Sequence, residues 1–135
     1  AWDSQSTGGD YFGRIYSTND YRGDHGSLSM QEVNNVMVAR GPSFKKGIVS
    51  RTPSSNVDVA PTVLRILGLA SGDDMDGRAL EEALVGGSRV SEVKWDTVVH
   101  EAIRECGIGT YKQKIAVSRV GSAFYPDYGN AIIEK

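Results

Sequence analysis

The clearest periodic pattern of apolar and polar positions lies near the middle of the chain and predicts a helix. Four apolar residues recur with the spacing i, i+4, i+7 and i+8: Val59, Val63, Ile66 and Leu67. This spacing places them on one face of an α-helix. Asp58 is suited to the N-cap position, Pro61 is tolerated in the first turn, and Gly68 is suited to end the helix. We therefore expect a helix over Asp58–Leu67 whose apolar stripe packs onto a sheet.

A compact apolar run earlier in the chain predicts a strand. Val36-Met37-Val38-Ala39 is too short for a stable helix, and its β-branched content favours a buried strand. Gly41-Pro42 follows directly and signals a turn. We expect the strand to join a sheet and the residues after the turn, Phe44 to Gly47, to continue as an exposed loop.

A second short helix is predicted after an acidic loop. Arg78 to Val85 has helical character and is followed by Gly86-Gly87, a pair that is typical of a helix end. The acidic loop before it contains Asp73, Asp74 and Asp76, which invites a metal-binding interpretation. The loop lacks the alternating oxygen ligands and the terminal glutamate of a calcium-binding loop. We therefore interpret it as a solvated turn.

The C-terminal third of the chain has the alternation expected of strands. Between Val93 and Val99 apolar and polar residues alternate in part, which indicates a half-exposed strand. Ile115-Ala116-Val117 and Ala131-Ile132-Ile133 predict two more strands. Tyr125 to Asn130 is rich in turn residues and is expected to join these two strands as a hairpin. The tail is thus expected to be antiparallel.

Composition narrows the class of protein without identifying it. A chain of 135 residues is long enough for one domain with a core. Its 15 Lys and Arg against 17 Asp and Glu give a net charge of -2, which provides no electrostatic reason to expect nucleic acid or an anionic membrane as a partner. No apolar run approaches the roughly 20 residues of a membrane span. Cys106 is the single cysteine, which excludes an internal disulfide and a cysteine zinc site.

The most promising chemical group is His25. It lies between Gly23 and Gly26, and neutral imidazole is a good zinc ligand. The alternative is a loop histidine that is hydrogen bonded to backbone. Asp24 either orients His25 or lies in solvent.

Other candidates carry weaker signals. His100 has no motif around it and is interpreted as an exposed histidine, and Cys106 is interpreted as a structural or surface thiol. Ser27 and Thr62 lack the context of a nucleophile.

Several segments, taken in order, carry a family resemblance. They are Gly23-Asp24-His25-Gly26, Met30, Val36 to Lys45, Asn56 to Thr62, Leu67-Gly68-Leu69, and Asp76-Gly77-Arg78 with Leu80. Together they resemble the C-terminal part of type I phosphodiesterase/nucleotide pyrophosphatases, which belong to the alkaline phosphatase superfamily. Each segment alone is a weak signal, and their order makes the combination fairly specific.

The resemblance implies a fold, a cofactor and a substrate class. It implies the C-terminal portion of an alkaline-phosphatase-like α/β sandwich, with residues 1–87 in the hydrolase domain and residues 88–135 as a β-rich antiparallel tail packed on it. It also implies a hydrolase of small phosphate esters that uses two zinc ions, an arrangement suited to phosphoryl transfer. His25 matches the family's late metal ligand in a Gly-x-His-Gly motif. Asp24 would be a ligand only under a different assignment of the motif.

The family's other functional segments are not found in these 135 residues. The nucleophile and the remaining metal ligands are absent, and one ligand does not hold a dinuclear site. We therefore expect a C-terminal piece of a longer hydrolase, inactive by itself, whose partner is the missing N-terminal part of the same protein. An extracytoplasmic or secreted location follows from the resemblance only. The alternative is a non-catalytic binding or interaction domain that keeps part of the hydrolase fold.

Overall fold

The computed structural model describes residues 28–72 and 74–134, and these fall into two compact units. The first, which we call the helical unit, consists of Met37–Thr97 and Ser118–Tyr125. The second, which we call the strand unit, consists of Val98–Val117 with the described residues up to Val36 and from Pro126 onwards. Each unit is described by itself.

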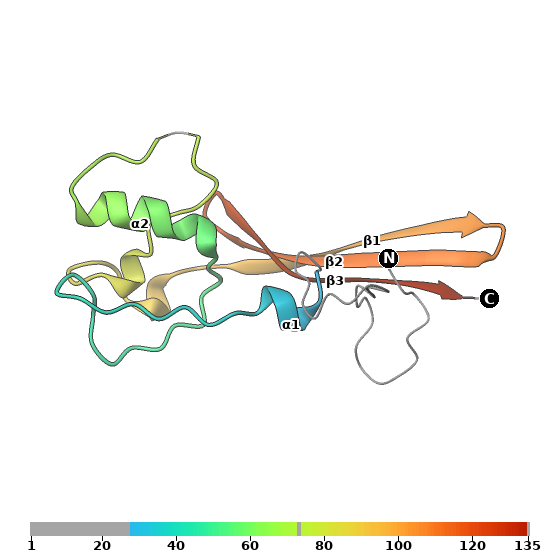
Figure 1. The fold of residues 1–135 in the computed structure, drawn as a ribbon, viewed down its shortest axis with the longest axis horizontal. Helices are drawn as coiled ribbons and strands as arrows, with labels where there is room; N and C mark the ends of the chain where they lie inside the picture. Colours follow the sequence, from blue (N-terminus) through green and yellow to red (C-terminus); the bar gives the residue numbers. More distant parts are fainter. Residues whose placement is uncertain (1–27, 73, 135) are drawn as a thin grey trace, which may run out of the picture. The chain divides into compact units, whose positions relative to one another are not determined.

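Within the described residues, three strands form an antiparallel sheet in the order β1-β2-β3 (Figure 1). They are β1 (Asp96–Cys106), β2 (Gly109–Val120) and β3 (Ala123–Glu134). Gly107-Ile108 connects the first pair and Gly121-Ser122 the second, with Gly121 at φ 61°, a conformation that favours glycine. The antiparallel tail predicted from the sequence is confirmed, as are strands at Ile115–Val117 and Ala131–Ile133.

The predicted position of the second hairpin turn was wrong, because Tyr125 to Asn130 lies inside β3. Pro126 is tolerated there because β3 lies at an edge of the sheet, the position to which proline in a strand is largely confined. Gly129 donates its N–H to the carbonyl of Leu28 at 2.7 Å. The first strand also begins later than expected, at Asp96 rather than near Val93.

The predicted central helix is confirmed as the 3-10 helix η1 (Asn56–Asp58) continued by α2 (Val59–Ile66). Gly68, at φ 71°, ends it as expected: its N–H bonds to Arg65 O, and the N–H of Leu69 bonds to Leu64 O at 2.9 Å. These two bonds form a Schellman motif. Asp58 directly precedes α2, at the predicted N-cap position, but its side chain makes no capping hydrogen bond to α2. Its carboxylate instead reaches back to the N–H of Ser55 at 2.8 Å, as a residue at the third helical position does in a capping box.

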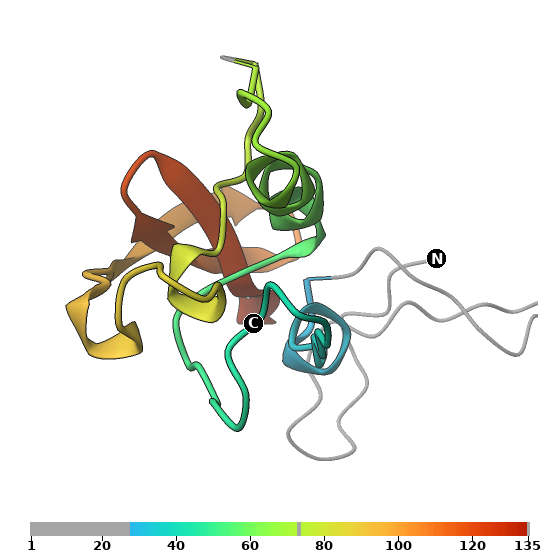
Figure 2. The same cartoon turned by 90° about the vertical axis from the view of Figure 1, so that its left-hand side faces the viewer.

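The expected orientation of this helix was wrong. The apolar stripe is exposed, with Val59, Val63 and Leu67 at 49%, 46% and 64%, whereas Pro61 and Thr62 are buried. In Figure 2 the helix is seen end-on and the segment that carries η2 (Glu81–Ala83) runs beside it. Hydrogen bonds to buried polar groups on this side of the helix, described below, fix the face that turns inward.

The buried strand predicted at Val36 to Ala39 was also wrong. This segment has no regular structure, and Val36 and Val38 are 88% and 86% exposed. It follows a four-residue helix, α1 (Met30–Val33). A short apolar run becomes a strand only when a neighbouring strand pairs with it, and none of the strands in the described part of the chain does so.

The turn at Gly41-Pro42 is confirmed by a hydrogen bond from the N–H of Phe44 to Gly41 O at 3.2 Å. Phe44 then forms an isolated antiparallel bridge with Leu84. The helix predicted over Arg78 to Val85 is reduced to one 3-10 turn, η2, followed by Gly86 at φ 80°. A further 3-10 turn, η3 (Val90–Glu92), precedes the sheet.

The interior of the helical unit is small and partly polar. Val120, Ala123 and Tyr125 form its apolar cluster, with Val93 packed against them. Among the described residues of this unit, five polar or charged residues are buried: Thr52, Asp58, Thr62, Glu82 and Ser118. The described helices include none long and apolar enough to span a bilayer.

Candidate functional site

The chemical groups singled out from the sequence do not form a cluster in the described residues. His25 and Asp24 lie outside these residues, as do Ser27 and Asp73. His100 is exposed on β1, as predicted, and Cys106 is exposed with its thiol donating to Gly109 O at 2.8 Å. Across residues 28–72 and 74–134, no three His, Cys, Asp or Glu side chains are placed to hold a metal ion. The proposed role of His25 therefore stays a prediction.

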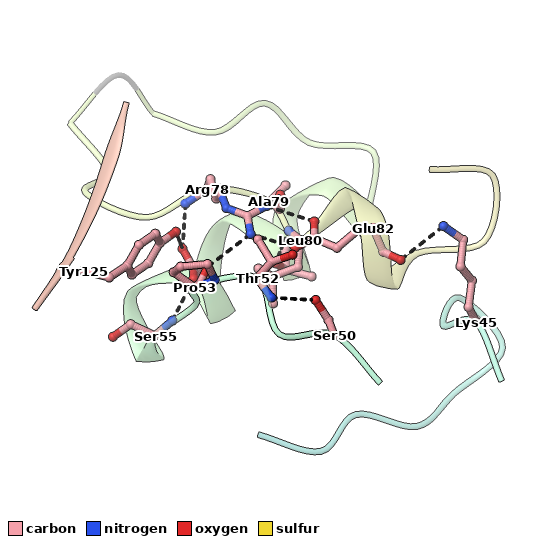
Figure 3. Close-up of polar contacts among 12 residues, drawn as sticks. Lys45, Ser50, Thr52, Pro53, Ser55, Arg78, Ala79, Leu80, Glu82 and Tyr125 are labelled. Atoms are coloured by element: carbon pink, nitrogen blue, oxygen red, sulfur yellow. Dashed lines mark hydrogen bonds and ion pairs between the residues drawn. The ribbon is translucent and has the colours of Figure 1, made fainter. Parts of the chain in front are cut away.

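The described residues do contain one buried polar network, and Asp58 is its centre. The Asp58 side chain is fully buried and its carboxylate accepts three hydrogen bonds: from the N–H of Ser55 at 2.8 Å, the N–H of Arg78 at 2.8 Å and the hydroxyl of Tyr125 at 2.9 Å. Figure 3 shows these three donors. Burial, together with the hydrogen bond to Asp58, raises the pKa of Tyr125 to about 12. The tyrosine is thus a neutral donor to a buried carboxylate.

A partly buried ion pair lies beside this carboxylate. The guanidinium of Arg78 makes two parallel hydrogen bonds to the Glu82 carboxylate, at 2.9 and 2.7 Å, and a third to Pro53 O at 3.3 Å (Figure 3). Burial by itself would lower the pKa of Arg78, but the hydrogen bonds and charge of Glu82 raise it overall. Burial would likewise raise the pKa of Glu82, and Arg78 outweighs it, so the pKa of Glu82 is lowered. Both groups are therefore held in their charged forms.

The network joins two segments that are separate in the sequence. Leu80 donates its N–H to the Thr62 hydroxyl at 3.0 Å, in addition to the bond between Arg78 and Asp58. A Cβ atom at Gly77 would lie 2.1 Å from Val57 O, a distance that no side chain tolerates, so the two backbones approach this closely only because position 77 is glycine. These are the segments Asn56–Thr62 and Asp76–Leu80 that carry much of the family resemblance.

The role of this network is structural. The carboxylate of Asp58 is shielded from solvent and already has three donors, which leaves it unsuited to bind a metal or to transfer a proton. We therefore assign Asp58, Arg78, Glu82 and Tyr125 the role of an anchor that holds together η1, the segment from Arg78 to η2, and the start of β3, and call these residues the anchor network.

The sequence pattern around Asp58 predicted a helix cap and did not indicate its partners. The i, i+4 spacing of Arg78 and Glu82 is a local signal that predicts an ion pair on a helix. Tyr125 has no such signal, because it reaches Asp58 from a distant strand.

Comparison with known proteins gives one short similarity. A curated protein named "Sulfatase ppz1", from Metarhizium majus (strain ARSEF 297), is 36% identical over 50 residues. This segment is 37% of the present chain and 12% of the sulfatase. No family model matches the chain, and no solved structure matches it. Sulfatases belong to the alkaline phosphatase superfamily, so the similarity agrees with the resemblance at the level of the superfamily and hints at a hydrolase.

Proposed function

We propose that this chain is part of a metal-dependent ester hydrolase of the alkaline phosphatase superfamily, acting on phosphate esters in the manner of phosphodiesterases and nucleotide pyrophosphatases. The observation that carries the proposal is the 36% identity to a sulfatase over 50 residues. The hydrogen bonds around the anchor network support it, because they join two of the resembling segments, Asn56–Thr62 and Asp76–Leu80, in space. Such mutual support is expected if the order of the segments reflects a shared fold.

His25 is the proposed metal ligand of this hydrolase. Its imidazole would supply one donor to a zinc ion in a site that holds two ions, and the nucleophile and remaining ligands would come from the part of the protein that precedes it. Zinc sites need about four donors, so His25 does not form a site without them. The anchor network would support the surrounding scaffold without touching the metals.

A sulfate ester is the second candidate substrate, because the matching protein is named a sulfatase. Phosphate and sulfate esters both place a negatively charged tetrahedral group at the metals, so one scaffold can serve either chemistry. The two candidates therefore differ in the substrate, not in the role proposed for His25.

The test uses the full-length protein that contains this chain, with His25→Ala compared against His100→Ala. The two variants remove the only two histidines of the chain, one proposed as a ligand and one exposed on β1. We expect His25→Ala to lose zinc and to lower the rate of hydrolysis roughly 100-fold or more. Mutation of residues that only hydrogen bond to metal ligands already costs about 10- to 100-fold in metal affinity or activity. His100→Ala should behave as the wild type.

Hydrolysis is measured on a chromogenic phosphodiester and on an aryl sulfate, with zinc content measured on the same samples. Turnover of the phosphodiester supports the first candidate, and turnover of the aryl sulfate alone supports the second. Wild-type activity and zinc content in His25→Ala would refute the ligand role. A full-length protein with no hydrolytic activity and no bound metal would favour the non-catalytic interaction domain.

A further inference from the structure

Three backbone carbonyls converge on the side-chain nitrogen of Lys45. Its Nζ donates to Glu82 O at 3.1 Å, to Gly87 O at 3.2 Å and, at a shorter distance, to Ser88 O. Figure 3 shows the lysine reaching Glu82. An ammonium has three N–H donors and no acceptor, so these three carbonyls satisfy it completely. The half-buried charge is thus surrounded by neutral oxygens, which are the donors that hard cations take from a backbone.

The backbone around these carbonyls has hydrogen bonds that do not involve the ammonium. Lys45 donates its backbone N–H to Ala83 O, and Val85 donates its N–H to Ser43 O, both at 2.9 Å. The N–H of Gly87 bonds to Leu84 O at 3.1 Å. A Cβ atom at Gly87 would lie 2.0 Å from Glu81 O, so this turn closes tightly only around glycine. These bonds hold the backbone on either side of the three carbonyls without the lysine side chain.

The surroundings favour a positive charge at this point. Glu82, whose carbonyl is one of the three, lies in η2, and its buried carboxylate is held in the ionised form by Arg78. Arg78 and, to a smaller extent, the charge of Lys45 lower the pKa of this carboxylate against the effect of burial. Removing the ammonium would leave three partly buried acceptors without a donor and one positive charge fewer beside Glu82, which is costly.

We propose that the carbonyls of Glu82, Gly87 and Ser88 form a binding site for a monovalent cation, in which the Lys45 ammonium is the resident ion. Once the lysine nitrogen is removed, the site takes a free cation of the same charge and hydrogen-bonding character, and ammonium is the closest match. The lysine thus neutralises and orders the carbonyls of this turn as a bound cation would, and it does so at any salt concentration. The proposal is independent of the hydrolase function.

The test is the rescue of Lys45→Ala, in the full chain, by an added cation, and the measured quantity is Tm from thermal unfolding. We expect Lys45→Ala to lower Tm by roughly 4 °C or more in choline chloride, a shift that corresponds to about one lost interaction in a domain of this size. Ammonium chloride at equal ionic strength should restore much of the loss in a saturable manner. Lys46→Ala is the matched control, since Lys46 is the adjacent exposed lysine. It and the wild type should have the same Tm in both salts.

A second variant, Lys45→Met, keeps most of the alkyl stem and provides for the case in which the alanine variant does not fold. Folding of either variant in ammonium chloride but not in choline chloride supports the proposal. An equal Tm for the variant in both salts would overturn it, as would a Tm equal to that of the wild type in choline chloride. Failure of both variants to fold in either salt would also overturn it, because the site would then not accept a free cation.

Discussion

Replacement of Asp58 by asparagine tests the anchor network most directly. The side chain keeps its shape, but an amide offers one oxygen where the carboxylate offers two. One carboxylate oxygen accepts from both Arg78 and Tyr125, and the other accepts from Ser55. If the amide oxygen faces the first pair, the amide nitrogen must face the N–H of Ser55, which places a donor against a donor.

The expected cost follows from counting these bonds. A hydrogen bond to a charged group contributes about 1.5–3 kcal/mol, and leaving a buried donor without a partner costs about 1–3 kcal/mol. We expect the free energy of unfolding to fall by about 3 kcal/mol, which is a large part of the stability of a typical domain. In a chain of this length that corresponds to a decrease in Tm of about 10 °C.

The measurement is urea and thermal unfolding of the chain, followed by circular dichroism. Asp76→Asn makes the same chemical change at an exposed aspartate nearby and should stay within about 0.5 kcal/mol of the wild type. Tyr125→Phe and the double variant complete a cycle, in which the two changes should be less than additive because they share a bond. A stability loss for Asp58→Asn no larger than that for Asp76→Asn would refute the network as described.

Three further predictions follow from the same geometry and from the proposed function. Gly77→Ala should lower the free energy of unfolding by more than about 1 kcal/mol, because the new Cβ would lie 2.1 Å from Val57 O. Gly107→Ala is the control and should cost less, because a Cβ there meets open space; both variants are compared by urea unfolding. The pKa of Tyr125 is raised from 10 to about 12, so the stability that this shift contributes should be complete below pH 10 and lost as the pH rises to about 12. The measurement is the free energy of unfolding as a function of pH in the alkaline range, and this dependence should be weaker in Tyr125→Phe. The 135-residue chain alone should retain no zinc through dialysis and hydrolyse no phosphodiester above background, and chelator-resistant, stoichiometric zinc would contradict the proposal that the other ligands lie elsewhere.

Local signals predicted the elements whose structure is decided locally. The helix was predictable because its spacing and Gly68 act within a few residues, and the turn at Gly41-Pro42 was predictable for the same reason. The inward face of the helix was not predictable, since it depends on Asp58 and Thr62 meeting partners from another segment. An apolar stripe shows that a helix has two unlike faces, but polar groups with buried partners decided which one turned inward here.

The strand errors have a related cause. Val36 to Ala39 has the composition of a strand, but pairing requires a neighbour, and composition does not report whether one is present. Tyr125 to Asn130 has the composition of a turn, but two glycine-containing turns elsewhere complete the hairpins, so these residues continue β3. Pro126 fits this strand only because it lies at an edge of the sheet.

The residues that carry the family resemblance divide into two kinds, and this division limits what the resemblance implies. His25 is the one proposed for chemistry, and it lies outside the described residues. Asp58, Thr62, Gly77 and Arg78 are described, and each holds one segment against another through hydrogen bonds or close approach. Scaffold residues of this kind serve any hydrolase built on the same fold, whichever ester it cleaves. A resemblance based on them therefore reaches no further than the superfamily and leaves the choice between phosphate and sulfate to the residues that contact the substrate.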